Sequence, residues 1–207
     1  MMPDARIAVL VPCYNEDAAI GTVVRDFRAA LPSATIYVYD NNSKDETVAR
    51  AREAGAIVRN ETRQGKGNVM RRMFADIEAD IYIIVDGDDT YDASVAPDLV
   101  RKLVDEGLDI VSGQRVATGQ AAYRAGHVLG NRLLTGLTAM IFRVKLNDML
   151  TGYRIMSRRF VKSFPFTAQG FGIETELTVH AVRLLMPMVE VETRYKERPE
   201  GSVSKLS

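Results

Sequence analysis

The chain has 207 residues, 46% of them hydrophobic, and its 27 lysine and arginine residues balance 27 acidic residues. Because the net charge is zero, no global basic field favours a nucleic-acid partner, and any anion-binding site must be local. The length suits a single domain with its own core, and the apolar runs are too short for a membrane-spanning helix.

The expected location of the chain is cytoplasmic. The first residues lack the charged leader and apolar core of a secretory signal. The lone Cys13 has no intrachain disulfide partner, which fits a reducing compartment, and we expect it to be a small buried hydrophobic residue. The last residues, RPEGSVSKLS, end without a terminal helix or turn, which leaves room for a membrane anchor beyond residue 207.

Short apolar runs rich in β-branched residues alternate along the chain with segments of helical period. The predicted strands cover residues 7–11, 35–39, 56–59, 81–85, 109–113 and 188–193. The predicted helices cover residues 17–31, 44–54, 66–79, 93–106 and 173–185, with Gly55 and Gly107 as helix stops. A long segment at about residues 121–142 and a patch rich in glycine and aromatic residues interrupt this order. The alternation predicts an α/β fold with a mostly parallel central sheet flanked by helices.

Unusual polar side chains follow the predicted strands at the points where the strands end. They lie at residues 12–16, 40–43, 86–88 and 114–115. Because such folds bind ligands at the carboxyl ends of parallel strands, we expect one site along this edge. No internal repeat, low-complexity tract or linker divides the chain, so residues 1–207 are predicted to form one domain.

The stretch YIIVDGDDTYD places four carboxylates within seven residues, at Asp86, Asp88, Asp89 and Asp92. Carboxylates at such close range repel one another unless a cation or water screens them. An EF-hand calcium loop is excluded, because its sixth and twelfth positions, counted from Asp86, hold Tyr91 and Pro97.

Three interpretations of this acidic stretch remain. Residues 86–90 fit the D-x-D-x-T pattern of haloacid-dehalogenase-like phosphatases, although they follow the fourth predicted strand rather than the first. The same residues fit a D-x-D pair that binds a divalent ion and a sugar-nucleotide diphosphate, with Gly87 leaving room for the ribose and diphosphate. The third interpretation is a solvated acidic turn that caps the helix beginning near Ala93.

The chain resembles the family 2 glycosyltransferases in a series of motifs that follow the family order. They are VPCYNE, YDNNSKDET, RQGKGN, VDGDDTYD, GQR, NDMLTGYR, FGIETEL and RPEGSVSK. The resemblance is greatest to the polyprenyl-phosphate hexose synthases, the group of dolichol-phosphate mannose synthase, and extends from about residue 7 to residue 205. It implies a GT-A fold with a nucleotide-sugar half at about residues 1–115 and an acceptor half at about 116–207.

The resemblance also implies which residues bind the nucleotide sugar. They are Pro12, Tyr14, Glu16, Asp40, Asn42, Lys66, Asp86, Gly87, Asp88, Arg198 and Lys205. In this set Asp40 matches the aspartate that contacts the base, and a carboxylate there accepts from a ring N–H; a helix cap is the alternative role of its turn. For Lys66 and Arg198 the alternative is a solvated surface side chain.

A divalent cation, Mg²⁺ or Mn²⁺, is implied at Asp86 and Asp88. Mannose synthases of this group typically carry a glutamine two residues after the second aspartate, where this chain has Thr90. A threonine hydroxyl can ligate a hard cation, so Thr90 completes the expected metal set. This departure leaves the donor open between GDP-mannose and UDP-glucose.

The implied catalytic residues on the acceptor side are Asp148, Arg115 and Arg124. The two arginines resemble residues that hold an acceptor phosphate, since a guanidinium engages phosphate oxygens in pairs. A phosphate acceptor is already deprotonated and needs no base, whereas a hydroxyl acceptor needs one, for which Asp148 is the candidate. Glu174 and Glu176 match the E-x-E helix of the family, where either one orients neighbouring basic side chains.

The segment GHVLGNRLLTGLTAMIF carries an apolar stripe at residues 129, 133, 137, 140 and 141. This stripe fits a core helix better than an interfacial helix on a membrane surface. Together the motifs predict an inverting, metal-dependent hexosyltransferase that charges a polyprenyl phosphate at the cytoplasmic face of a membrane. The alternatives are a family 2 transferase acting on a soluble sugar, glycerate or protein hydroxyl, an aspartyl-nucleophile phosphatase, and an inactive sugar-nucleotide-binding module.

Overall fold

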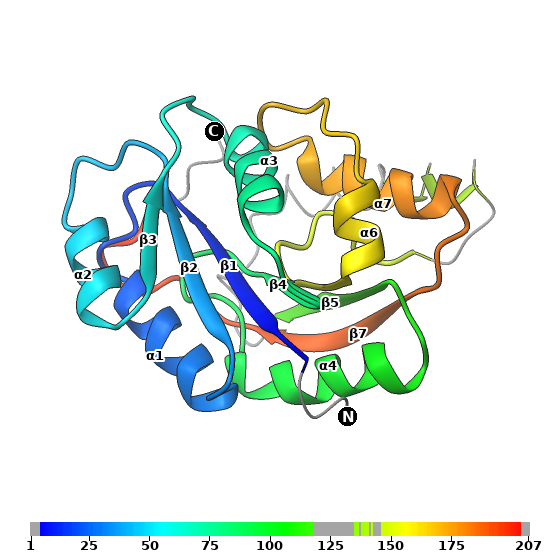
Figure 1. The fold of residues 1–207 in the computed structure, drawn as a ribbon, viewed down its shortest axis with the longest axis horizontal. Coiled ribbons are helices and arrows are strands. Elements are labelled where there is room, and N and C mark those ends of the chain that lie inside the picture. The colour runs from blue at the N-terminus through cyan, green and yellow to red at the C-terminus, as the bar shows by residue number, and fades with distance from the viewer. Residues whose placement is uncertain (1–4, 118–134, 137, 141, 143–145, 204–207) are drawn as a thin grey trace.

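The computed structural model of the protein describes residues 5–117, 135–136, 138–140, 142 and 146–203. Within these residues a seven-stranded sheet has the order β3-β2-β1-β4-β6-β5-β7. Figure 1 shows β3, β2 and β1 side by side at one end of this sheet. The strands are β1 (Ile7–Cys13), β2 (Thr35–Asp40), β3 (Ile57–Asn60), β4 (Ile81–Ile84), β5 (Ile110–Ala117), β6 (Arg154–Ser157) and β7 (Met188–Tyr195). Of these, β6 runs antiparallel to its neighbours β4 and β5, whereas the other neighbouring strands pair in parallel. The predicted α/β class with a mostly parallel sheet is confirmed.

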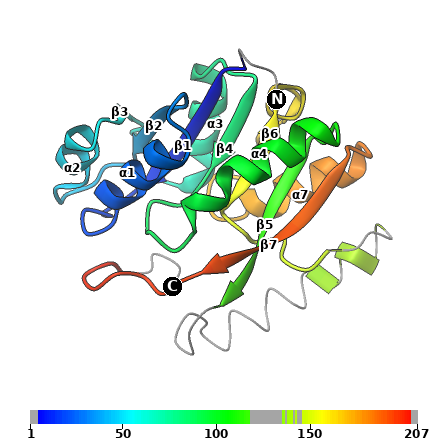
Figure 2. The same cartoon turned by 90° about the horizontal axis from the view of Figure 1, so that it is seen from below.

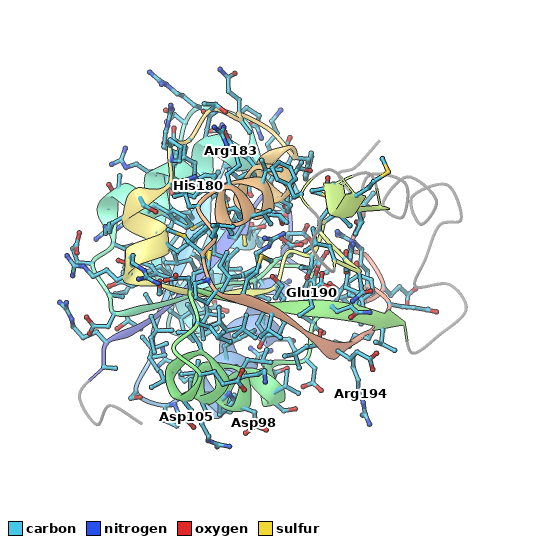
Figure 3. All side chains as sticks on the ribbon, turned by 90° about the vertical axis from the view of Figure 1, so that its right-hand side faces the viewer. Asp98, Asp105, His180, Arg183, Glu190 and Arg194 are labelled. Carbon is cyan, nitrogen blue, oxygen red and sulfur yellow. The ribbon has the colours of Figure 1, made fainter. Side chains whose placement is uncertain are left out.

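Helices cover both faces of the sheet. They are α1 (Ile20–Ala30), α2 (Thr47–Glu53), α3 (Lys66–Asp76), the 3-10 helix η1 (Ala93–Val95), α4 (Ala96–Asp105), α6 (Arg158–Ser163) and α7 (Ile173–Arg183). Figure 3 shows α4, with Asp98 and Asp105, on the opposite side of the sheet from α7, with His180 and Arg183. Among the described residues, no helix is long and apolar enough to cross a membrane.

Two hydrophobic clusters lie between the sheet and the helices. Val9 and Val11 belong to the cluster under α1 and α4, whereas Ala8 and Leu10 belong to the cluster under α3, α6 and α7. This alternation follows from the period of two in a strand, which sends successive side chains to opposite faces. Because both faces are covered, the neighbouring strands β1 and β4 are apolar along almost their whole length, as parallel strands of this class are.

Several helices begin later than predicted, because side chains in the preceding loops make turns of their own. Helix α1 begins at Ile20 rather than residue 17, after a turn in which Asn15 has a φ of 52° and the Ile20 N–H donates to the Glu16 carbonyl oxygen. Helix α2 begins at Thr47, whose N–H donates to Asp45 Oδ1 at 3.0 Å. The predicted stops Gly55 and Gly107 follow α2 and α4 with φ angles of 94° and 61°.

Strand β6 and helix α6 were not predicted from the sequence. The strand has four residues and begins with a buried arginine, Arg154, so it shows neither an apolar run nor an alternation of polarity. Helix α6 follows at once, with Ser157 as its cap, since Ser157 Oγ accepts from the Phe160 N–H at 3.1 Å. Most of the predicted segment at residues 121–142, including Arg124, lies outside the described residues, as does Lys205.

Replacing Leu185 by glycine is expected to stabilise the fold. Leu185 follows α7 with a φ of 52° and is 87% exposed, so its side chain gains little from burial while its backbone is in the left-handed region. Glycine relieves this strain, and we expect the free energy of unfolding to rise by about 0.5–1 kcal/mol, measured by urea denaturation. The matched control is Leu184→Gly, which has a φ of −91° and should destabilise; a loss of stability in both variants would contradict the prediction.

Candidate active site

The loops that follow β1, β2 and β4 meet at one edge of the sheet. Cys13 at the end of β1 pairs with Asp40 at the end of β2, and Leu10 pairs with Ile84 of β4. The segment after β7, red in Figure 2, extends toward the side of the molecule that carries α1 and α2. Its Arg198 reaches the loop after β4, where it contacts Asp88. The predicted gathering of polar side chains at the carboxyl ends of the strands is therefore present.

The four carboxylates after β4 have different partners. Asp86 Oδ1 is 2.6 Å from Lys66 Nζ, and Asp88 Oδ2 is 2.5 Å from Arg198 Nη2. Asp89 Oδ1 is 2.8 Å from Lys196 Nζ, while Asp92 caps η1 by accepting from the Ser94 N–H at 2.9 Å. The capping interpretation of the acidic stretch thus holds for Asp92, whereas Asp86 and Asp88 face cations from distant parts of the chain.

Asp88 is the more buried of the D-x-D pair. Its side chain is 4% exposed, compared with 29% for Asp86. Burial raises the pKa of Asp88, and the nearby charge of Asp86 raises it further, whereas Arg198 lowers it. Thr90 Oγ1 donates to Asp88 Oδ1 at 2.7 Å, so the hydroxyl that we expected on a metal orients the Asp88 carboxylate in this structure.

Two glycines let the backbone approach this loop closely. A Cβ on Gly87 would lie 2.6 Å from Cys13 Sγ, and a Cβ on Gly152 would lie 2.1 Å from Asp86 Oδ2. Gly87, assigned to the donor site from sequence, therefore packs β4 against the end of β1. Gly152 has a role that the sequence did not reveal, because it brings the turn before β6 against the Asp86 carboxylate.

Lys66 is a buried lysine that joins two carboxylates. Its Nζ lies 2.6 Å from Asp86 Oδ1 and 2.5 Å from Glu174 Oε1, and its side chain is 13% exposed. Burial opposes its charge, but Asp86 and Glu174 outweigh this effect and raise the pKa of Lys66. The alternative of a solvated surface lysine is wrong. Glu174 of the E-x-E pair orients Lys66, whereas Glu176 accepts from the Ala168 N–H at 3.0 Å.

Asp40 has an oxygen available for a ligand. Its Oδ2 accepts from the Ser43 N–H at 3.1 Å, whereas its Oδ1 is buried and has no hydrogen-bond partner among the described residues. Buried polar atoms nearly always have partners, so a donor from a ligand suits this oxygen. Pro12 lies in β1 opposite Tyr39, the residue before Asp40, and Tyr14 follows the last residue of β1. Both side chains are half-buried.

Asn41 is a residue of this site that the sequence analysis missed. Its Nδ2 donates to the carbonyl oxygens of Glu61 and Arg63 at 2.7 and 2.9 Å, and its Oδ1 accepts from the Gly65 N–H at 2.8 Å. It therefore holds the loop that leads to Lys66. Asn42 donates to the Thr62 carbonyl oxygen at 3.0 Å in this structure, and its binding of the donor stays a prediction. Two adjacent asparagines gave no sequence signal to tell these roles apart.

The segment after β7 is held against the loop after β1 by Glu16. Arg198 Nη1 lies 3.4 Å from Glu16 Oε1, and Ser202 Oγ donates to Glu16 Oε2 at 3.0 Å. Arg198 also contacts Asp88, so one guanidinium connects the loops after β1 and β4. Glu16, expected at the nucleoside, is thus engaged by the C-terminal segment in this structure, and Arg198 is not a solvated surface side chain.

Asp148 and Arg115, which the sequence assigned to the acceptor, form a bidentate ion pair. Arg115 Nε and Nη2 donate to the two Asp148 oxygens at 2.7 Å each, and the Arg115 N–H adds a bond of 3.1 Å. Burial opposes the charge on Arg115, but the Asp148 carboxylate outweighs it and raises the Arg115 pKa. Both oxygens of the candidate base are therefore bonded to a cation, which suits a positioning role better than proton abstraction.

Glu190 on β7 is a second residue that the sequence did not reveal. Its carboxylate, labelled in Figure 3, accepts from the N–H groups of Asn147 and Asp148 at 2.7 and 2.9 Å. These bonds fix the loop that carries Asp148. A glutamate inside a predicted strand gives no sign of such a contact, because its partner lies 42 residues earlier in the chain.

The residues at the edge fit a divalent cation. No cluster of three or more His, Cys, Asp or Glu side chains with metal-binding geometry occurs among the described residues. Mg²⁺ in phosphate-transfer sites, however, is held by one or two carboxylates together with substrate phosphates. Asp86 and Asp88, whose charges interact with each other, match that chemistry.

Comparison with known proteins identifies relatives along nearly the whole chain. The family model of glycosyl transferase family 2 matches residues 8–164. Glycosyltransferase AglJ of Haloferax volcanii is 37% identical over 207 residues, covering 99% of this chain and 67% of that protein. A dolichyl-phosphate hexose transferase of the same organism is 28% identical over 192 residues, covering 93% of this chain and 83% of that protein.

Solved structures of similar fold include glucosyl-3-phosphoglycerate synthase from Mycobacterium tuberculosis. Its complex with Mn²⁺, UDP and glucosyl-3-phosphoglycerate has a TM-score of 0.79 and 26% identity, covering 95% of this chain and 74% of that one. These neighbours are GT-A fold glycosyltransferases, so the predicted fold is confirmed.

Replacing Gly152 by alanine is expected to disturb the site through a steric clash. The added methyl group would collide with the Asp86 carboxylate, and overpacking of this kind costs about 1–3 kcal/mol in the free energy of unfolding. Urea denaturation measures the loss. The matched control is Gly170→Ala, because a Cβ there has no atom within 4 Å and should change stability by less than about 0.5 kcal/mol. Equal effects of the two substitutions would contradict the close contact.

Proposed function

The chain belongs to glycosyl transferase family 2, and we propose that it transfers a hexose from a nucleotide sugar to a polyprenyl phosphate with the help of a divalent cation. The observation that carries this proposal is the edge of the sheet where Asp40 presents a buried oxygen that no described residue bonds, and where Asp86 and Asp88 face Lys66 and Arg198. A nucleotide sugar has a base at one end and a diphosphate between its ribose and its hexose, and the two parts of this edge suit the base and the diphosphate.

On the donor side, Asp40 accepts a hydrogen bond from the base, and Asp86 and Asp88 hold Mg²⁺ or Mn²⁺. When bound, the cation supplies positive charge that stabilises the leaving nucleoside diphosphate. Lys66 and Arg198 add fixed positive charge at the same place, because their side chains already lie at the two aspartates. The Mn²⁺ and UDP in the structure of the mycobacterial synthase support this assignment by analogy.

The acceptor side favours a nucleophile that needs no base. A phosphate oxygen is deprotonated at neutral pH, so it can attack the anomeric carbon from the face opposite the diphosphate without losing a proton. Both oxygens of Asp148 are bonded to Arg115, which leaves this carboxylate poorly placed to take a proton from a hydroxyl. The name of the relative that is a dolichyl-phosphate hexose transferase points to the same acceptor.

A soluble acceptor is the second candidate. The mycobacterial neighbour was solved with phosphoglyceric acid and with glucosyl-3-phosphoglycerate, so the fold also accommodates an acceptor without a lipid tail. Membership of family 2 favours glycosyl transfer over the phosphatase alternative. A polyprenyl carrier resides in a membrane, and we accordingly place the reaction at its cytoplasmic face, with the chain meeting the membrane surface there.

Donor binding is expected to require a divalent cation and Asp88. In calorimetric titrations with GDP-mannose and UDP-glucose, we expect one donor to bind with Mg²⁺ or Mn²⁺ and to lose at least about tenfold in affinity in EDTA, since loss of coordinating partners typically costs this much. Asp88→Asn should cause a similar loss in the presence of metal. The control is Asp92→Asn, which alters only the cap of η1. Equal donor affinity with and without metal would contradict the proposal that a divalent cation at Asp86 and Asp88 binds the diphosphate.

The acceptor is tested by competition. We expect transfer of radiolabelled hexose to a short polyprenyl phosphate and none to the matching polyprenol or to 3-phosphoglycerate. Because no base is needed, Asp148→Asn should keep more than about a hundredth of the wild-type kcat, whereas loss of a required general base costs about 10²–10⁴. Complete loss of activity in a folded Asp148→Asn protein, or preference for a hydroxyl acceptor, would favour the second candidate.

A further inference from the structure

Arg154 is a fully buried cation with no carboxylate in contact. It is 1% exposed and begins β6, where it pairs with Ile84 of β4 and Ser112 of β5. Among the described residues, no carboxylate lies within ion-pair distance of its guanidinium, and its Nη1 has no hydrogen-bond partner. Burial lowers the pKa of Arg154, although the field of Glu174 and Asp148 opposes this shift.

Such a group is expensive to bury. A charge taken out of water is compensated only by excellent geometry and by satisfied hydrogen bonds, and apolar side chains of similar volume often replace buried ionic groups with no loss of stability. The core around β6 is apolar on both faces, so packing alone would be served by methionine. The bonds that the guanidinium makes therefore point to its role.

These bonds join two segments that carry site residues. Arg154 Nη2 donates to the Met149 carbonyl oxygen at 2.6 Å and to the Glu174 carbonyl oxygen at 3.1 Å, and Nε donates to the Thr151 carbonyl oxygen at 3.3 Å. The first segment, residues 148–152, begins with Asp148, the partner of Arg115, and includes Gly152, which packs on Asp86. The second is the start of α7, where the Glu174 side chain holds Lys66.

We propose that Arg154 is a positioning residue of the transferase site, whose planar guanidinium fixes the Asp148 segment and the start of α7 in one arrangement. Through these segments it sets the distance between the Arg115–Asp148 pair on the acceptor side and the Lys66–Asp86 pair on the donor side. The inference rests on the proposed function for the meaning of those two sides. It does not require Arg154 to touch either substrate.

Other bonds hold the Asp148 segment to β5 and to Tyr91. Thr151 Oγ1 donates to the Gly113 carbonyl oxygen at 2.6 Å, and the Gly152 N–H donates to the Tyr91 hydroxyl at 2.8 Å. Loss of the guanidinium should therefore loosen the segment rather than unfold it. Because a misplacement of about 1 Å can cost about 10²-fold in rate, loosening is enough to lower kcat.

The test compares Arg154→Met, which keeps the volume and removes the donors, with Arg154→Lys, which keeps a charge but not the planar fork. We expect kcat to fall about 10–100-fold in Arg154→Met, with the donor KM within about threefold of wild type, and to recover in part in Arg154→Lys. Hydrogen–deuterium exchange should be about tenfold faster at residues 147–152 and 173–178 of Arg154→Met. This second readout needs neither substrate nor activity.

The matched control is Met156→Ala, two residues along β6 on the same face and 0% exposed. It should lose stability through a cavity while keeping kcat and the exchange rates of both segments. The proposal is overturned if Arg154→Met exchanges at wild-type rates in both segments, or if its kcat falls no further than that of Met156→Ala. Failure of both Arg154 variants to fold would also overturn the proposal, because Arg154 would then be required for folding of the core rather than for positioning the site.

The outcome for Arg154 is distinguishable from the outcome for the proposed function. If the wild-type protein transfers hexose to no acceptor, the proposed function is contradicted, while the exchange rates still decide whether Arg154 holds the two segments together. If the wild type is active and the exchange rates do not change, the function stands and the role of Arg154 is refuted.

Discussion

The ion triad of Lys66 with Asp86 and Glu174 is the interaction on which the arrangement of the site depends. It joins the start of α3, the loop after β4 and the start of α7, which are otherwise far apart in the sequence. A lysine buried to this degree keeps its charge only if carboxylates surround it. The buried lysine consequently fixes the positions of both carboxylates. The segments that contact Asp86 or Glu174 are positioned by the same ion pairs.

The carboxylates after β4 face cationic side chains from different segments of the chain. Lys66 forms an ion pair with Asp86, Arg198 with Asp88, and Lys196 with Asp89. Each pair draws another segment to the loop, so the electrostatics of a short acidic stretch determines where α3 and the segment after β7 lie. A chain whose net charge is zero can therefore still concentrate many charged side chains of both signs around one loop.

The sequence predicted the elements up to β5 well and those around β6 poorly, for physical reasons. The first strands are apolar runs separated by helices of clear period, so the sheet and the residues at its carboxyl ends followed from local pattern. Strand β6 instead begins with Arg154, and only its neighbours β4 and β5 make it a strand. The contacts of Asn41 and Glu190 are likewise set by tertiary structure, since both bind segments that no local period identifies.

The two sides of the site balance charge in opposite ways. On the side that we propose for the donor, the carboxylates of Glu16, Asp40, Asp86, Asp88 and Glu174 face the cations Lys66 and Arg198. On the side that we propose for the acceptor, Arg115 is matched by Asp148, and the Arg154 guanidinium bonds the Met149 and Thr151 carbonyl oxygens of the same segment. An excess of negative charge attracts a divalent cation, whereas arginine side chains favour an anion. Because a metal-bound diphosphate leaves on one side and a phosphate attacks from the other, this division of charge suits both ends of the proposed reaction without a proton transfer.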